Sequence, residues 1–204
     1  MGDTRGMKDR LAHLAVAAVL GLGLMASTAA AADDAVSGGS ALKRNQARQA
    51  TVRGTCPTDL GLDAPAAAQE SAMLCLVGAA RERYGLPPFT QSEALRRSAI
   101  EKDDDLLRCN EFSHTACGRD FSFWIRESGY MSADCWRVGE NLAWGIDGQG
   151  TVTAIFRAWM RSPAHRANIL GDFGETGIAL RVGPLGGLTG VHLWTQHFGS
   201  HCGN

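Results

Sequence analysis

Apolar residues recur every three to four positions in four segments of the chain, which is the spacing of one face of an α-helix. Between residues 69 and 84, for example, Met73, Val77 and Ala80 form such a stripe, and Gly85 ends it. The segment from Ser92 has the same spacing and begins with a good N-cap residue. The pattern therefore predicts amphipathic helices over residues 69–84, 92–109, 120–130 and 151–160.

The decapeptide RSPAHRANIL, residues 161–170, predicts a further short helix. Ser162 is a suitable N-cap, Pro163 suits the first helical position, and Gly171 can close the C-terminal end. His165 then lies in the first turn, where the helix dipole favours neutral imidazole, the form that binds a metal ion or accepts a proton. His165 is thus either a functional ligand or simply a polar residue at a helix start.

The apolar pattern changes from helical to alternating after residue 171. The segments TGIALRV and VHLWTQHF alternate as strands do, and PLGGLTG between them supplies turn residues. A C-terminal antiparallel hairpin is therefore predicted. Because the helices come first, the strands last, and no alternation of strand and helix occurs, the fold class is α+β, with helices packed on a small antiparallel sheet.

The first 32 residues have the three-part pattern of a secretory signal peptide. Basic residues precede an apolar run over 11–25, and small residues follow at 27–32. A membrane anchor is the alternative, but the run is short for a bilayer span. We expect a secreted or cell-wall-associated protein with no membrane span after cleavage. We expect residues 33–68 to form a flexible leader and residues 69–204 to form one domain. The composition of the leader is more typical of a solvated linker than of a basic segment that binds a cell-wall polymer.

Net charge and cysteine content argue against several classes of function. The formal net charge is −1, and removal of a segment with three basic and two acidic residues leaves −2. This balance argues against nucleic acid or an anionic membrane as the main partner. Six cysteines without a CxxC pair indicate three disulfides rather than a metal site or a catalytic thiol. Fifteen connectivities are possible, of which we expect Cys56 with Cys75, Cys109 with Cys117, and Cys135 with Cys202.

Three polar positions are candidates for chemistry. His114 lies in FSH after the second helix, Glu140 in GENLAWG, which we expect to form a turn bounded by glycines, and His165 in SPAHRAN. Two histidines and a carboxylate from separate segments are what a divalent-ion site or a general-base site requires. The acidic run 103–105 is a weaker candidate for calcium, because consecutive helical residues point about 100° apart. We expect that run to be a solvated helix face.

The motifs taken together resemble a known family. GLPPF, FSH, GY, GENLAWG, AWMRSPAHRANIL, TGIAL and WTQHFG occur in the order and approximate spacing of bacterial members of the CAP family, also called SCP-like extracellular proteins. The resemblance covers about residues 72–199. It implies a three-layer α-β-α sandwich (the CAP/SCP fold), export, and a cleft lined by two histidines and an acidic residue.

Only some of the family's site residues have a matching residue in this sequence. His114 matches the first cleft histidine and Glu140 the glutamate of GEN. Ser162 and Leu193 stand where eukaryotic members have a second glutamate and a second histidine, whereas His165 matches the histidine of the bacterial SPxHRxNIL motif. The eukaryotic four-residue zinc or magnesium site is therefore incomplete here. A site for Zn or Mg formed by His114, Glu140 and His165 is our hypothesis.

The resemblance implies a non-enzymatic binding module for a divalent ion, a lipid or another small ligand, or for a cell-wall or protein partner. Trp144, Trp159 and Trp194 could wall an apolar cleft, although core packing is more common for tryptophan. The alternative is a metal-assisted hydrolase of peptide or cell-wall substrate, with the three candidate residues as catalytic groups. Against it, GxSxG, HExxH and an unpaired thiol are missing, and Ser113 beside His114 is no evidence for a dyad. A structural role at the cell surface is a third possibility.

Overall fold

The computed structural model describes residues 56–132 and 135–201 as one layered α+β domain. The predicted helices are confirmed, with the first beginning at Ala66 rather than at residue 69 and the third reduced to five residues. The elements are α3 (Ala66–Arg83), β1 (Thr90–Gln91), α4 (Glu93–Arg108), the 3₁₀ turn η1 (Ala116–Gly118), α5 (Phe123–Glu127), β2 (Trp136–Gly145), the 3₁₀ turn η2 (Asp147–Gln149), α6 (Val152–Arg161), α7 (Pro163–Ile169), β3 (Glu175–Leu185) and β4 (Leu188–His201).

The strands form one mixed sheet in the order β1-β3-β4-β2. The predicted hairpin is confirmed as β3 and β4, joined through Gly186 and Gly187. Both glycines have positive φ, 61° and 80°, as a two-residue hairpin loop requires. The short strand β1 pairs with β3 in parallel, so the sheet is not purely antiparallel.

The prediction of a turn at GENLAWG is wrong, because this segment forms the edge strand β2. It pairs antiparallel with β4 along ten residues, from Trp136 to Gly145. Gly145 lies close to other backbone, since a Cβ added there would lie 2.3 Å from the carbonyl oxygen of Gln149. Gly145 therefore allows close packing at the end of the strand. Pairing with β4, which is distant in sequence, decides the conformation.

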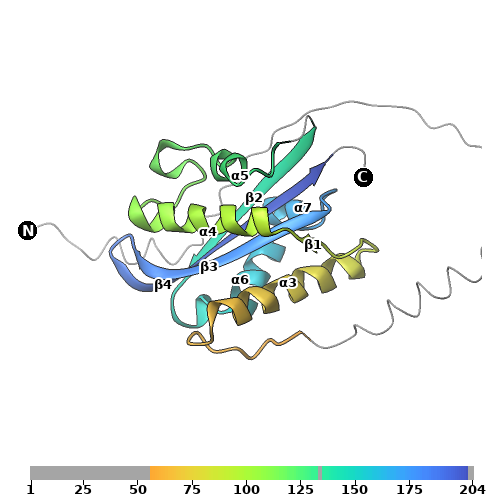
Figure 1. Ribbon diagram of the computed structural model, residues 1–204. Coiled ribbons are helices and arrows are strands. Elements are labelled where there is room, and N and C mark those ends of the chain that lie inside the picture. The colour runs from red at the N-terminus through yellow and green to blue at the C-terminus, as the bar shows by residue number, and fades with distance from the viewer. Residues whose placement is uncertain (1–55, 133–134, 202–204) are drawn as a thin grey trace, which may run out of the picture.

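Helices cover both faces of the sheet, which gives the predicted three layers (Figure 1). On one face α3, α6 and α7 bury a large apolar cluster that includes Trp159, Trp194 and Phe198. On the other face α4 and α5 cover two smaller clusters, centred on Leu106 and on Ile125. The tryptophans Trp159 and Trp194 are completely buried, so they pack in the core and do not wall an open cleft.

Side chains cap the starts of α4 and α6 but not the start of α7. The side chain of Ser92 accepts a hydrogen bond from the Leu95 N–H and caps α4, as predicted. Pro163 is the first residue of α7 and Ser162 is its N-cap residue, but the Ser162 hydroxyl makes no capping bond. It is buried and has no hydrogen-bond partner in the described part of the chain. The helix ends at Ile169, two residues before Gly171.

The guanidinium of Arg81 on α3 ties together the turns that follow α3 and α7. It donates to the carbonyl oxygens of Pro87, Ile169, Gly171 and Phe173 at 2.7–3.1 Å. The side chain is almost fully buried, and the desolvation lowers the pKa of Arg81. A buried guanidinium that satisfies four carbonyls acts as a cross-link between segments that are about 90 residues apart.

Two of the expected disulfides are confirmed, Cys56 with Cys75 and Cys109 with Cys117. The third, Cys135 with Cys202, involves a residue outside the described part of the chain. The predicted signal peptide and most of the predicted leader also lie outside it. Within residues 56–132 and 135–201, no helix is long and apolar enough to span a bilayer.

Candidate functional site

Glu140 on β2 is held between two histidines. Its Oε1 lies 2.6 Å from Nδ1 of His114, and its Oε2 lies 2.9 Å from Nε2 of His197. The side chains of Glu140 and His197 are 1% and 0% exposed, whereas that of His114 is 15% exposed. His114 is therefore the end of this group nearest the surface. The structure brings together two of the three predicted site residues, His114 and Glu140.

His197 is a site residue that the sequence analysis did not identify. It stands directly opposite Glu140 in the β2–β4 register, so both side chains lie on the same face of the sheet. Its other ring nitrogen, Nδ1, lies 2.7 Å from the hydroxyl of Ser98 on α4. The residue was visible in WTQHFG, but only the pairing of strands more than 50 residues apart places it beside Glu140. We call Ser98, Lys102, His114, Glu140 and His197 the Glu140 network.

The Glu140 network keeps its central carboxylate ionised. Burial alone raises the pKa of Glu140, but hydrogen bonds from His114 and His197 and the charges of His197 and Lys102 outweigh it, so the pKa lies below its ordinary value. Lys102 is 2% exposed and donates from Nζ to the backbone oxygen of His114 at 2.9 Å. The network thus holds an orienting negative charge at the buried end of the His114 ring.

His165 lies on the other side of β2. Glu140 and Asn141 are consecutive strand residues, so their side chains point to opposite faces. The Asn141 amide donates to the backbone oxygen of His165 at 3.2 Å, which places α7 on the face opposite Glu140. The His165 side chain is buried, and its Nδ1 has no hydrogen-bond partner within residues 56–132 and 135–201. Burial, and secondarily the charge of His114, lowers its pKa to about 4, so the ring is neutral.

The donor arrangement fits the predicted metal site only in part. Both oxygens of Glu140 already accept from histidines, and in the described residues no group of three or more His, Cys, Asp or Glu side chains could hold a metal ion. The contact between His114 and Glu140 does match the way carboxylates orient metal-binding histidines. Glu140 is therefore better placed to support a ligand-binding histidine than to bind an ion itself.

The acidic run after Lys102 is not a solvated face, and that expectation is wrong for two of its three members. Asp103 is completely buried and accepts from the Thr195 hydroxyl, and burial raises its pKa well above the ordinary value. Asp104 is exposed and pairs with Arg181 on β3. Asp105 is almost fully buried. The three carboxylates point in different directions, as expected, and each meets a different partner.

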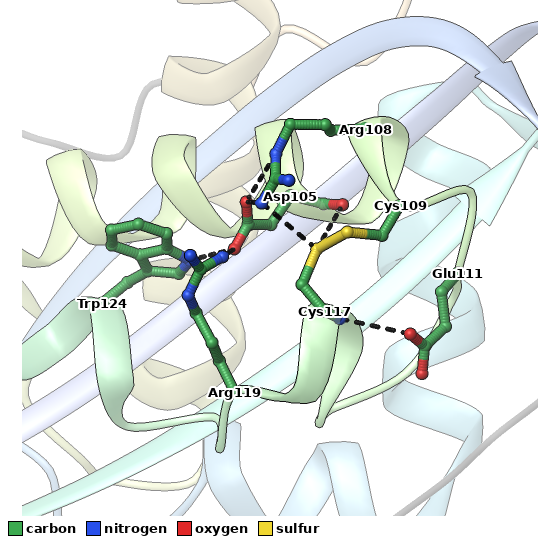
Figure 2. Close-up of a disulfide and its surroundings, with 7 residues drawn as sticks. All are labelled: Asp105, Arg108, Cys109, Glu111, Cys117, Arg119 and Trp124. Carbon is green, nitrogen blue, oxygen red and sulfur yellow. Dashed lines mark hydrogen bonds and ion pairs between the residues drawn. A yellow bond between two sulfur atoms is a disulfide. The ribbon is translucent and has the colours of Figure 1, made fainter.

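Asp105 and a disulfide anchor the loop that carries His114. The carboxylate of Asp105 accepts from Arg108, from Arg119 at 2.5 Å and from the indole of Trp124 at 3.0 Å. The hydrogen bonds and charges of Arg108 and Arg119 hold the pKa of Asp105 low despite burial. Figure 2 shows this cluster beside the Cys109–Cys117 disulfide, which closes a loop with a sequence separation of eight residues. His114 is therefore presented from a loop fixed at both ends.

Ser113 does not form a catalytic pair with His114. Its hydroxyl lies 3.0 Å from the hydroxyl of Thr115 and accepts from the Thr115 backbone N–H at 3.1 Å. These bonds form a local turn that uses the serine side chain. The cysteines offer no nucleophile either, since none of those described is free.

Comparisons with known proteins agree with this geometry. The model of the CAP, cysteine-rich secretory protein family matches residues 74–198. The uncharacterized protein YkwD of Bacillus subtilis (strain 168) is 33% identical over 132 residues, which are 64% of this chain and 47% of that protein. The chain thus spans about half the length of that relative.

Two solved structures share the fold. An outer surface protein from Borrelia burgdorferi is 19% identical with a TM-score of 0.53, over 64% of this chain and 91% of that one. An extracellular protein containing a SCP domain from Bacillus anthracis strain Ames is 21% identical with a TM-score of 0.55, over 65% of this chain and 40% of that one. With the family model matched over most of the described residues, the chain belongs to the CAP family.

Proposed function

We propose that this chain is an exported CAP-domain binding module whose ligand, a divalent ion of the zinc class or another small ligand, binds at His114. The observation that carries the proposal is the 2.6 Å contact between Nδ1 of His114 and the buried carboxylate of Glu140. A carboxylate on one ring nitrogen fixes the tautomer and the orientation of an imidazole and raises its basicity.

Glu140 acts in this proposal as an orienting residue, since its oxygens are already used by His114 and His197. His165, on α7, is a second neutral imidazole, and the charge of His114 helps to lower its pKa. Neutral imidazole is the form that binds zinc. A bound ion would supply a positive centre for an anionic or carbonyl group of a partner.

Export is supported by the signal-peptide pattern and by the disulfides, which persist in oxidising compartments. A lipid remains a candidate ligand, together with a cell-wall or protein partner. The burial of Trp159 and Trp194 removes two of the three residues that suggested an apolar cleft, and Trp144 is half-buried. A polar contact at His114 is therefore the better-supported mode of binding.

The proposal is tested by titrating the mature protein with zinc and with magnesium in a calorimeter. We expect binding in the wild type and its loss in a His114→Ala, His165→Ala double variant. His201→Ala is the matched control, because His201 is also partly exposed but lies at the end of β4. Unchanged zinc binding in the double variant would contradict the ion site. Extraction of the purified protein, followed by mass spectrometry, detects a lipid or other small ligand that remains bound.

A hydrolase acting on peptide or cell-wall substrate is the second candidate, favoured by the same contact. An imidazole oriented by a buried carboxylate is a suitable general base for activating water. This function requires turnover of peptide or peptidoglycan that depends on Glu140. Product release that does not exceed that of a Glu140→Gln variant would count against it.

A further inference from the structure

Two buried residues on α4 bond to the two histidines that hold Glu140. Ser98 and Lys102 are four residues apart, so they lie on one face of the helix, one turn from each other. They are 1% and 2% exposed. The buried side of α4 packs against the sheet through apolar residues such as Leu95 and Ala99, and it also carries Asp103, which accepts from the Thr195 hydroxyl. Two polar side chains in such a surface cost desolvation energy that their hydrogen bonds must offset.

Ser98 holds the ring of His197. Its hydroxyl lies 2.7 Å from Nδ1 of His197 and 2.8 Å from the carbonyl oxygen of Leu95, to which it donates. The other ring nitrogen lies 2.9 Å from Oε2 of Glu140. A ring bonded at both nitrogens cannot rotate without losing a hydrogen bond. Ser98 therefore fixes the direction from which His197 meets Glu140.

Lys102 holds the backbone of His114. Its ammonium donates to the His114 carbonyl oxygen at 2.9 Å, and its charge contributes to the low pKa of Glu140. The Cys109–Cys117 disulfide ties the same loop to the residue that follows α4. The helix thus contacts the loop at two places, one close to His114 and one covalent.

We propose that Ser98 and Lys102 are positioning residues, through which α4 sets the spacing of the two histidines around Glu140. The inference rests on the proposed function, because it describes how the binding histidine is oriented. Leu95 and Ala99 show that apolar residues satisfy the packing of this helix. The two polar residues have a specific partner each, His197 for Ser98 and the His114 loop for Lys102.

The test measures imidazole ¹⁵N shifts by NMR, together with zinc affinity, in the mature protein. We expect Ser98→Ala to change the shifts of both His197 and His114, and Lys102→Met to change those of His114. Zinc affinity should fall by about 10-fold in each, as is typical when a residue that orients a ligand is removed. Lys102→Arg keeps a donor and a charge, and should restore most of the affinity.

Two variants serve as controls. Ser128 also donates to a carbonyl three residues before it, that of Ile125 at 2.8 Å, but its hydroxyl has no histidine partner among the described residues. Arg97 is on the same helix as Ser98 and Lys102 and donates to the backbone oxygen of Ser128. Ser128→Ala and Arg97→Met should leave the histidine shifts and the zinc affinity unchanged.

The measurements separate this proposal from the proposed function. Histidine shifts in Ser98→Ala and Lys102→Met that equal those of the controls would overturn the positioning role. If the wild type binds no zinc while the shifts change as expected, the ion site is wrong and the positioning role holds. Because the shifts are recorded on folded protein, a general loss of stability does not produce the expected result.

Discussion

Replacing Glu140 by glutamine removes a charge and one acceptor while the side chain keeps its shape. In the wild type the two carboxylate oxygens accept from Nδ1 of His114 and Nε2 of His197. A glutamine amide has one acceptor oxygen, and its NH₂ group only donates. The glutamine oxygen can therefore accept a hydrogen bond from only one of the two histidines. At the other histidine, the ring N–H faces the glutamine NH₂ group, which is also a donor.

The magnitude follows from these two contacts. A hydrogen bond to a charged group contributes about 1.5–3 kcal/mol, and a neutral one about 1 kcal/mol. The loss of one bond and the weakening of the other should lower the free energy of unfolding by about 3 kcal/mol at pH 7. In a domain of this size the thermal midpoint should then fall by about 10 °C.

The effect should depend on pH in a defined direction. The folded-state pKa of Glu140 lies below its ordinary value, so the carboxylate stabilises the folded state above the unfolded-state pKa. This contribution is lost as the pH falls through the lower, folded-state pKa. Glutamine does not titrate, so the difference in stability between wild type and Glu140→Gln should narrow as the pH is lowered from about 7 to about 3.

Urea denaturation followed by tryptophan fluorescence measures both effects. Glu127→Gln is the control, because Glu127 is an exposed carboxylate at the end of α5 and its replacement should change little. The reasoning is refuted if Glu140→Gln unfolds within about 0.5 kcal/mol of the wild type at pH 7, the range of an ordinary surface substitution. A difference that stays constant from neutral to acidic pH would refute the electrostatic part alone.

Two further predictions concern buried cations and imidazoles. Arg81→Met should lower the free energy of unfolding by about 3 kcal/mol, because it leaves buried carbonyl oxygens of two turns without a hydrogen-bond donor. Thermal denaturation measures this effect, with Arg83→Met as the control because Arg83 is exposed. Equal thermal midpoints for the two variants would contradict the prediction. His165→Gln should flatten the loss of stability between about pH 6.5 and about pH 4. The folded His165 ring stays neutral down to about pH 4 while the unfolded chain takes up a proton, and an unchanged pH slope would disprove this.

Local signals in the sequence predicted the features that depend on neighbouring residues. The start of α4 at its Ser92 cap and the hairpin turn at Gly186 and Gly187 involve contacts within a few positions. The pairing of Cys109 with Cys117 is similarly short in sequence. Helix periodicity also identified the buried stripe of the first helix, which includes Met73, Val77 and Ala80.

Local signals failed where a partner comes from a distant segment. Asp103 and Asp105 look like a solvated charged run, but Thr195 and Arg119 reach them in the folded chain. GENLAWG has the glycines of a turn and becomes a strand because β4 supplies its hydrogen-bond partners. The pattern of charges or glycines along the sequence does not show which distant residue will pair with a given side chain or strand in the folded chain.

The sequence by itself determined the helices, the hairpin and two members of the site, His114 and Glu140. The tertiary structure decided how those two meet, added His197, and placed α7, the helix that carries His165, on the opposite face of β2. The physical reason is strand register. A shift of one residue exchanges the two faces of a strand, and the register between β2 and β4 is set by packing across the whole sheet.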